Sequence, residues 1–213
     1  MQPVAIVHQD DHLLVVDKPA GILVVPADGR SGPSLVDVLP KLVGGPVFAV
    51  HRLDEETTGA LAFARSDEAR IGMEALFRAH AIERDYLALA SAAPSPPAGR
   101  IESNLREGDD GIVRVVPTGG QRAVTHYETL ARRDRCTLVR CRLETGRRNQ
   151  IRVHLAALGC PVAGDRKYGF RARPGERFRR VMLHSWRMGF VHPVTGERIA
   201  VEVPAAEPLL RPE

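Results

Sequence analysis

One aspartate stands in a setting that suits chemistry. Asp54 lies in a short polar stretch, residues 51–59, between apolar runs at residues 47–50 and 60–64. Each run has the length of a buried strand, and the Thr-Thr-Gly before the second run is typical of a turn. Arg52 shares the stretch. Strands on both sides hold a loop rigidly, so we expect a fixed carboxylate beside a guanidinium, although a turn or cap role is the alternative for a lone aspartate.

A second stretch combines positive charge with a predicted helix start. Gly146 breaks the preceding predicted strand, Arg147 and Arg148 follow, and a helical pattern begins at Asn149. The apolar residues at helical spacing, and the glycine that would cap the helix, are Ile151, Leu155, Leu158 and Gly159. Free backbone donors at a helix start, with arginines beside them, favour an anion such as phosphate.

These stretches resemble a known family. Residues 51–54 resemble the His-Arg-Leu-Asp signature of the pseudouridine synthases of the RluA family. Residues 146–154 resemble its Gly-Arg-x-His-Gln-Ile-Arg-Val-His motif, and residues 159–169 its Gly-x-Pro-Ile-x-Gly-Asp-x-x-Tyr-Gly motif. Residues 183–193 resemble its Leu-His-Ala and Phe-x-His-Pro segment. The matches follow the family's order from about residue 10 to residue 203.

Three positions depart from the family pattern. Thr58 stands where serine is common, Asn149 where histidine is common, and Arg84 where the family usually has the lysine of Lys-x-Tyr. These departures concern RNA contacts, and none touches Asp54 or Arg152.

The resemblance implies an RNA-modifying isomerase in which Asp54 is catalytic, Arg152 pairs with it and Tyr86 lies near the flipped uracil. Without the resemblance, Tyr86 is a strand aromatic. A guanidinium within ~4 Å lowers a carboxylate's pKa by ~1–3 units and fixes its direction. Asp54 could attack carbon 1 of the ribose, remove the proton on carbon 2 or add to the uracil; we favour proton removal with a glycal intermediate.

The base must leave its stack before it can react, which costs a few kcal/mol, roughly, and favours loops or stem-loops of ribosomal or transfer RNA as substrates. Arg52 is placed to enter the vacated space, because a planar guanidinium can stack and bind phosphate. The residues expected to contact RNA are His51, Arg52, Arg147, Arg148, Asn149 and Gln150. Residues 166–180 would also hold the RNA backbone.

Charge is placed unevenly along the 213 residues. The net charge is +4, yet residues 1–70 carry an acidic excess and residues 71–213 a basic one. Seven basic residues and one acidic residue fall within residues 166–180. Arginine clusters suit phosphate, and a solvated charged face is the alternative.

Several classes of protein are disfavoured. No apolar run approaches the ~20 residues of a membrane span, and the first residues lack the pattern of a signal peptide. The three cysteines show no Cys-x-x-Cys spacing, which favours reduced thiols in the cytoplasm. No metal or nucleotide motif is present, and the isomerisation is redox-neutral, so we expect no metal, no cofactor and no membrane partner. We expect a monomer.

We predict an α+β fold with a mixed, mostly antiparallel sheet, flanking helices and a central cleft. Residues 1–213 would form one catalytic domain, a short form without an N-terminal RNA-binding domain. Predicted strands cover residues 4–7, 13–16, 83–90, 100–105, 112–116, 123–130 and 136–143, the last four as an antiparallel meander.

Two further helices are expected. One starts at Ser34 and ends near Pro40, because proline lacks a backbone donor. The other is capped by Ser66, and its core-facing residues at helical spacing are Ala69, Met73, Leu76, Phe77 and His80.

Two alternatives stay open. A catalytically silent RNA-binding homologue could act in RNA folding or ribosome assembly. A glycoside hydrolase would need two opposed carboxylates, and Glu55 and Glu56 are merely adjacent to Asp54.

Overall fold

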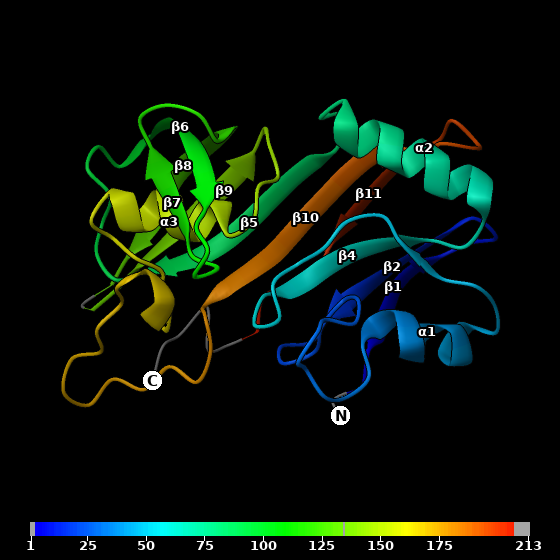
Figure 1. The fold of residues 1–213 in the computed structure, drawn as a ribbon, viewed down its shortest axis with the longest axis horizontal. Helices are drawn as coiled ribbons and strands as arrows, with labels where there is room; N and C mark the ends of the chain where they lie inside the picture. The colour runs from blue at the N-terminus through cyan, green and yellow to red at the C-terminus, as the bar shows by residue number, and fades with distance from the viewer. Residues whose placement is uncertain (1–2, 134, 207–213) are drawn as a thin grey trace. The chain divides into compact units, whose positions relative to one another are not determined.

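The computed structural model describes residues 3–133 and 135–206. The chain forms two compact units (Figure 1). Unit 1 comprises Met1–Arg84 and Ser185–Pro204, and unit 2 comprises Asp85–His184 and Ala205–Glu213. Three helices and eleven strands confirm the predicted α+β class among the described residues.

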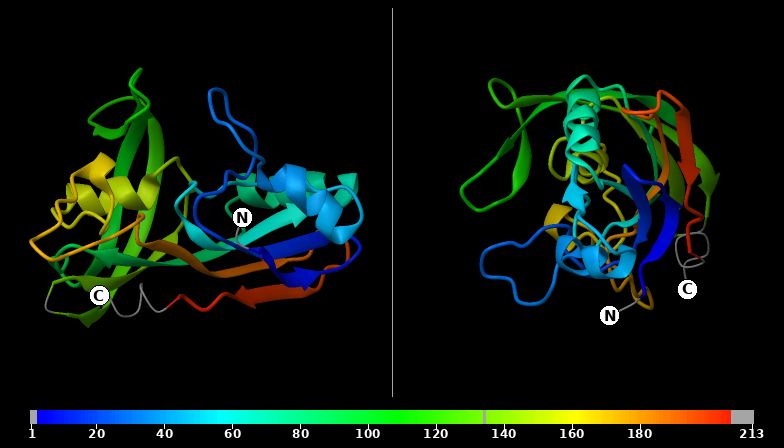
Figure 2. Two further views of the ribbon diagram at one scale, coloured as in Figure 1. Left: turned by 90° about the horizontal axis from the view of Figure 1, so that it is seen from below. Right: turned by 90° about the vertical axis from the view of Figure 1, so that its right-hand side faces the viewer.

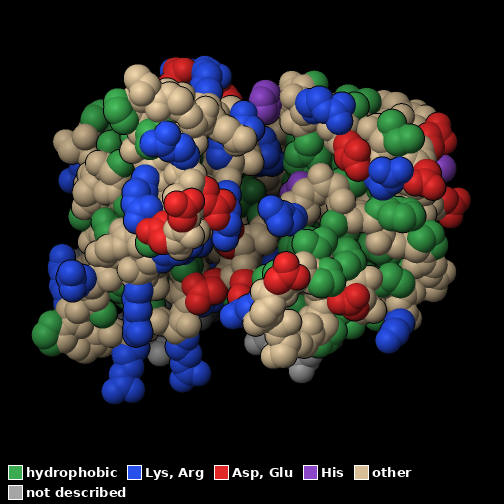
Figure 3. Space-filling model, viewed as in Figure 1, with side chains coloured by type: hydrophobic (Ala, Val, Ile, Leu, Met, Phe, Trp, Pro, Cys, Tyr) green, Lys and Arg blue, Asp and Glu red, His purple; other side chains and the backbone are tan. Residues whose placement is uncertain are grey.

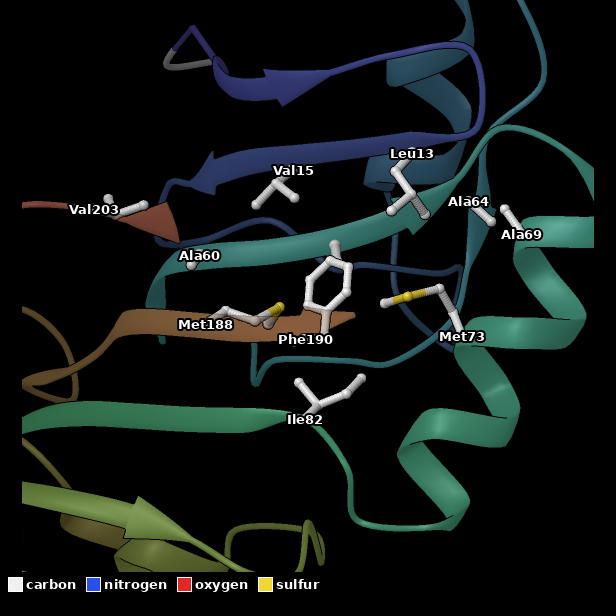
Figure 4. Packing of buried hydrophobic residues seen from close by; sticks show 11 residues of the cluster. Leu13, Val15, Ala60, Ala64, Ala69, Met73, Ile82, Met188, Phe190 and Val203 are labelled. Carbon is white, nitrogen blue, oxygen red and sulfur yellow. The ribbon is translucent and has the colours of Figure 1, made fainter. Parts of the chain in front are cut away.

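Unit 1 is built on a mixed, mostly antiparallel arrangement of strands. In spatial order they are β1 (Ala5–Gln9), β2 (Leu13–Lys18), β4 (Thr58–Ala64) and β10 (Leu183–Val191); β3 (Phe48–Ala49) pairs with β4, and β11 (Arg198–Glu202) pairs with β10. The pairs β1–β2, β2–β4, β3–β4 and β10–β11 are antiparallel, whereas β4 and β10 run in the same direction (Figure 4). Asp10 closes the β1–β2 turn, because its Oδ1 accepts the backbone N–H groups of His12 and Leu13 at 2.7 Å. The predicted N-terminal strand pair is confirmed.

Helix α2 (Asp67–Arg78) covers one face of this sheet (Figure 4). Leu13 and Val15 alternate along β2 and, with Phe190 of β10, pack against Met73 of the helix. All four side chains are buried. The residues at a period of two on β2 therefore face the core-facing residues of α2, as predicted for Met73.

Ser66 caps α2 by accepting the backbone N–H of Ala69 at 3.2 Å, which confirms the predicted start. The end of the helix was predicted too late. His80 lies beyond the last turn, exposed, with a left-handed backbone at φ 56°. The N–H groups of His80 and Ala81 bond back to the carbonyls of Phe77 and Leu76, so the helix terminates before histidine can reach the core.

Helix α1 (Leu35–Val43) passes through Pro40, which corrects the predicted end. Proline loses a donor but keeps its carbonyl, and that carbonyl accepts the N–H of Gly44 at 3.1 Å. Gly44 is left-handed at φ 66° and caps the helix. Before α1, residues 25–33 form a loop that projects from unit 1 (Figure 2, left, blue).

The strands of unit 2 belong to the same eleven-stranded sheet and pair antiparallel with one another. In spatial order they are β5 (Glu83–Ala90), β9 (Thr137–Leu143), β8 (Gln121–Arg132), β6 (Ala98–Glu107) and β7 (Val113–Val116). The predicted strands are confirmed, but the simple meander is wrong. The short β7 pairs only with the end of β6, from Asn104 to Glu107, whereas the long β8 pairs with β6 from Ala98 to Leu105 on its other edge.

Helix α3 (Gln150–Ala157) and the 3₁₀ turn η1 (Arg166–Tyr168) complete unit 2. Val153 of α3 packs with Leu105, Val113 and Ala123 of the sheet. The predicted cap, Gly159, is left-handed at φ 75°. The three cysteines are free and buried. None of the helices described is long and apolar enough to cross a membrane.

Candidate active site

The Asp54 loop connects β3 to β4 in unit 1. Strand β3 ends after Ala49 pairs with Phe63, and the side chain of His51 then continues the ladder. Its Nε2 accepts the backbone N–H of Ala62 at 3.0 Å. A side chain thereby takes the place of a main-chain carbonyl and fastens the start of the loop to β4.

His51 must be neutral to do this. Its ring stacks on Phe77 at 4.5 Å between centroids. Burial, assisted by the positive charge of Arg84, lowers the pKa of His51 from 6.5 to about 3. Since Nε2 accepts a hydrogen bond, the single ring proton resides on Nδ1. The structure therefore engages His51 within its own loop, and its contact with RNA stays a prediction.

Lys18 holds the other end of the loop. It is fully buried, and its Nζ donates to the carbonyls of Glu55 at 2.8 Å, Pro19 at 2.9 Å and Thr57 at 3.0 Å. This role of Lys18 was not predicted from the sequence. A signal was present, since Lys18 follows the buried Leu14 and Val16 at the strand period of two.

The loop's own backbone completes its shape. Thr57 N–H donates to the Asp54 carbonyl at 3.1 Å, and Gly21 N–H donates to the Glu55 carbonyl at 2.9 Å. The side chain of Glu55 forms an ion pair with Arg30 of the projecting loop. Asp54 is thus fixed through main-chain contacts on both sides.

Arg52 differs from its neighbours. Its side chain is exposed, and it makes no hydrogen bond or ion pair within the part of the chain that the structure describes. It stands two residues from Asp54 on an anchored loop, so its guanidinium is available to a ligand.

In unit 2, Arg152 is held by a buried carboxylate. Its Nε and Nη2 donate to Asp165 at 2.6 and 2.8 Å, and Nη1 donates to Asn149 Oδ1 at 3.2 Å. The side chain of Arg152 is 11% exposed and that of Asp165 is 0% exposed. The family resemblance implied Asp54 as the partner of Arg152, and Asp165 was not predicted, although it belongs to the motif at residues 159–169. The pairing with Asp54 stays a prediction.

Tyr168 supports the same group. Its hydroxyl accepts from Asn149 Nδ2 at 2.8 Å and from the Val113 backbone N–H at 3.2 Å. The guanidinium of Arg152 lies 5.1 Å from its ring centroid. Asn149, left-handed at φ 55°, links Tyr168 to Arg152 through the two ends of one amide.

Gln150 is used entirely inside unit 2. Its Oε1 accepts from Thr145 at 2.8 Å and from Arg147 N–H at 3.0 Å. Its Nε2 donates to the Val124 carbonyl and to Thr125 Oγ1, both at 2.9 Å. The buried amide of Gln150 therefore connects the start of α3 to β8 by hydrogen bonds.

The two arginines before α3 also have partners. Arg147 Nε donates to the Arg122 carbonyl at 3.0 Å, and Arg148 forms an ion pair with Glu107. The RNA contacts predicted for Arg147, Arg148, Asn149 and Gln150 stay predictions. If Arg148 binds a phosphate, the phosphate would replace Glu107 as the partner of its guanidinium.

Tyr86 lies on β5, where it pairs with Cys141 of β9 and is 6% exposed. Its neighbour Asp85 forms an ion pair with Arg142 at 3.1 Å. The structure thus brings His51, Arg52 and Asp54 together in unit 1, and places Tyr86 with Arg152 in unit 2. Among the described residues, no group of three His, Cys, Asp or Glu side chains could hold a metal ion.

Comparison with known proteins identifies the family. A family model described as RNA pseudouridylate synthase matches residues 12–157. The ribosomal large subunit pseudouridine synthase D of Zymomonas mobilis is 36% identical, over 92% of this chain and 68% of its own. Its namesake in Xanthomonas campestris is 37% identical, over 98% and 68%, and the uncharacterized RNA pseudouridine synthase YhcT of Bacillus subtilis is 38% identical, over 93% and 68%.

Solved structures agree. The human RNA pseudouridylate synthase domain containing 4 superposes with a TM-score of 0.79 at 28% identity, covering 97% of this chain and 90% of its own. The human RNA pseudouridylate synthase domain containing 1 superposes with a TM-score of 0.80 at 26% identity, covering 98% of this chain and 89% of its own. The chain therefore belongs to the RNA pseudouridylate synthase family, the isomerases that convert uridine in RNA to pseudouridine.

Proposed function

We propose that this enzyme isomerises specific uridines in ribosomal RNA, with transfer RNA as the second substrate class, and that Asp54 is its catalytic residue. The observation that carries the proposal is the anchoring of the Asp54 loop by His51 and Lys18 in a chain of this family. Relatives named for the large ribosomal subunit favour ribosomal RNA.

The reaction breaks the N1–C1′ bond of uridine, turns the base and forms a C5–C1′ bond. Asp54 takes the proton from C2′, which leaves a glycal and a free uracil; the proton returns to C2′ as C5 attacks C1′. Tyr86 packs against the base; its hydroxyl oxygen takes the proton that C5 loses as the hydroxyl passes its own proton, directly or through water, to N1, so Tyr86 ends the reaction neutral. Fixed placement of these groups lowers the barrier without any change in redox state.

Arg52 opens the way for the base. Its exposed guanidinium stacks in the space that the flipped uridine leaves and can bind the neighbouring phosphate. An RNA loop supplies such a base cheaply, because its bases are already unstacked.

Asp54→Asn tests the central assignment. Release of tritium from RNA labelled at C5 of uridine should vanish, while RNA affinity stays within about three-fold, because a single loop carboxamide leaves phosphate contacts intact. Glu56→Gln, two residues along the same loop, is the control and should retain turnover. Turnover by Asp54→Asn refutes the assignment, and no release by the unaltered enzyme would favour the silent RNA-binding alternative.

The proton-removal step has its own test. Deuterium at C2′ of the target uridine should slow single-turnover isomerisation by a primary isotope effect. An unchanged rate, measured under conditions where chemistry limits the reaction, would exclude C2′ deprotonation and favour attack of Asp54 on C1′ or on the base.

The predicted pairing of Arg152 with Asp54 can be tested by a double-mutant cycle. Single-turnover rates of Asp54→Glu, Arg152→Lys and the double variant should be non-additive by about 1 kcal/mol or more if the side chains interact. Additive losses would remove Arg152 as the partner of Asp54.

A further inference from the structure

Among the described residues, the segment that follows η1 in unit 2 carries the densest group of arginines without an ion pair. We name residues 169–182 the arginine loop; it has no regular secondary structure. Its exposed arginines are Arg171, Arg173, Arg177 and Arg179. Within residues 3–133 and 135–206, none of these four side chains makes an ion pair or a hydrogen bond.

Several other arginines of unit 2 form ion pairs with carboxylates. On the sheet, Arg100 and Arg122 both pair with Glu102, at 2.5 and 2.6 Å, and Arg140 pairs with Glu128 at 2.7 Å. The single acidic residue of the arginine loop, Glu176, accepts the backbone N–H of Arg173 at 2.8 Å. The loop therefore keeps its charge for an external anion.

The arginine loop is fixed in place from within unit 2. Phe170 and Phe178 meet edge to face at 5.4 Å, and Met182 N–H donates to the Ala163 carbonyl at 2.9 Å. Gly164 allows the loop to approach closely, because a Cβ there would lie 1.9 Å from the Arg180 carbonyl oxygen.

The tip of the loop is a tight turn. Glu176 N–H donates to the Arg173 carbonyl at 3.0 Å, and Arg135 Nη1 donates to the Pro174 carbonyl at 3.4 Å. Arg177 and Arg179 flank the half-buried Phe178, and both are exposed to solvent. Lys and Arg side chains protrude where Figure 1 places this loop (Figure 3, lower left).

We propose that the arginine loop is the anchor for the phosphate backbone of substrate RNA, and that it contributes more of the electrostatic affinity than Arg147 and Arg148. The inference rests on the proposed function as an RNA isomerase. Guanidinium groups bind phosphate oxygens through two parallel hydrogen bonds, and ordered anchors reduce the entropy lost on binding. Such contacts position RNA without reading its sequence.

The test is binding of a fluorescein-labelled RNA stem-loop with uridines in its loop, followed by anisotropy at several salt concentrations. Asp54→Asn is the background, so binding is measured without turnover. Replacing Arg171, Arg177 and Arg179 by glutamine should weaken binding at least about ten-fold and reduce the slope of log K against log salt by about two, since each phosphate contact contributes roughly 0.7–0.9.

A matched control removes the same charge elsewhere in unit 2. Replacing Arg100, Arg122 and Arg140 by glutamine should change the slope by less than about one, because these arginines already hold carboxylates. Arg147→Ala with Arg148→Ala should also change it less than the loop variant does. Equal effects of the two glutamine triples, or an unchanged slope in the loop triple, overturn the proposal.

Two measurements keep the result interpretable. Arg177→Gln and Arg179→Gln as single substitutions should each lower the slope by roughly 0.7–0.9, which covers the case of an unstable triple variant. With Asp54 intact, the loop triple should raise KM more than it lowers kcat in the tritium assay. Failure of the proposed function would appear differently, as absence of tritium release from the unaltered enzyme.

Discussion

The two units hold their predicted catalytic side chains by different means. In unit 1, Lys18 binds three backbone carbonyls, two of them within the Asp54 loop. In unit 2, Asp165 binds the guanidinium of Arg152 directly. The first device fixes the path of a chain, and the second fixes the direction of one side chain. A loop held by its backbone can accept changed side chains, whereas a side-chain pair fails when either member changes.

The largest effect is expected in unit 2. Asp165→Asn keeps the shape of the side chain but breaks the buried ion pair between Asp165 and Arg152, which should cost about 3–5 kcal/mol of unfolding free energy. Urea denaturation monitored by circular dichroism measures it. Asp110→Asn, which breaks the exposed pair with Arg114, is the control and should cost less than about 1 kcal/mol. Similar losses in both variants would contradict the special place of Asp165.

Lys18→Met should lower the unfolding free energy by about 2 kcal/mol, which is less than the loss expected for Asp165→Asn. The substitution leaves three carbonyls without their donor, but it also removes a buried charge. Isomerisation should fall as well, since the Asp54 loop loses its anchor. Lys41→Met, at an exposed position of α1, gives the comparison and should cost less than about 1 kcal/mol. If Lys18→Met retains full activity and stability, backbone anchoring is not what orders the loop.

Acid should loosen both units through histidine. Burial lowers the pKa of His51 to about 3 and that of His154 in α3 to about 4, from 6.5. The folded state thus binds fewer protons than the unfolded state, so stability is complete above pH 6.5 and falls as pH drops toward 4 and 3. Each histidine contributes at most ~1.4 kcal/mol per pH unit.

The two histidines can be separated by mutation. His51→Asn and His154→Asn should each flatten the fall in unfolding free energy between pH 6 and 4, measured by urea denaturation at each pH. An unchanged slope in His51→Asn would show that its ring is not held neutral by the bond to Ala62 N–H.

The smallest effect on stability is expected at Arg52. Arg52→Ala should change the unfolding free energy by less than about 0.5 kcal/mol, because the exposed side chain has no partner among the described residues. Single-turnover isomerisation should nevertheless fall by roughly 100-fold, as expected when a base is no longer held for reaction. A 2-aminopurine beside the target uridine should lose its flipping signal. Normal flipping would assign Arg52 another role.

Local signals in the sequence were sufficient for most elements. The strand period placed Leu13 and Val15 on one buried face, and Ser66 marked the start of α2. Ends were harder, because they depend on backbone bonds: α1 continues through Pro40, and α2 stops before His80. The position of β8 beside β6 could not be predicted, since strand order depends on pairing between distant segments.

The candidate site divides in the same way. Motif order named Asp54, Arg52, Tyr86 and Arg152, because residue type and spacing are written in the sequence. The neutral state of His51, the buried amine of Lys18 and the pair between Arg152 and Asp165 were decided by tertiary structure alone. Each of these three features depends on burial and on a partner from elsewhere in the fold. Burial and partner are both determined only when the chain has packed.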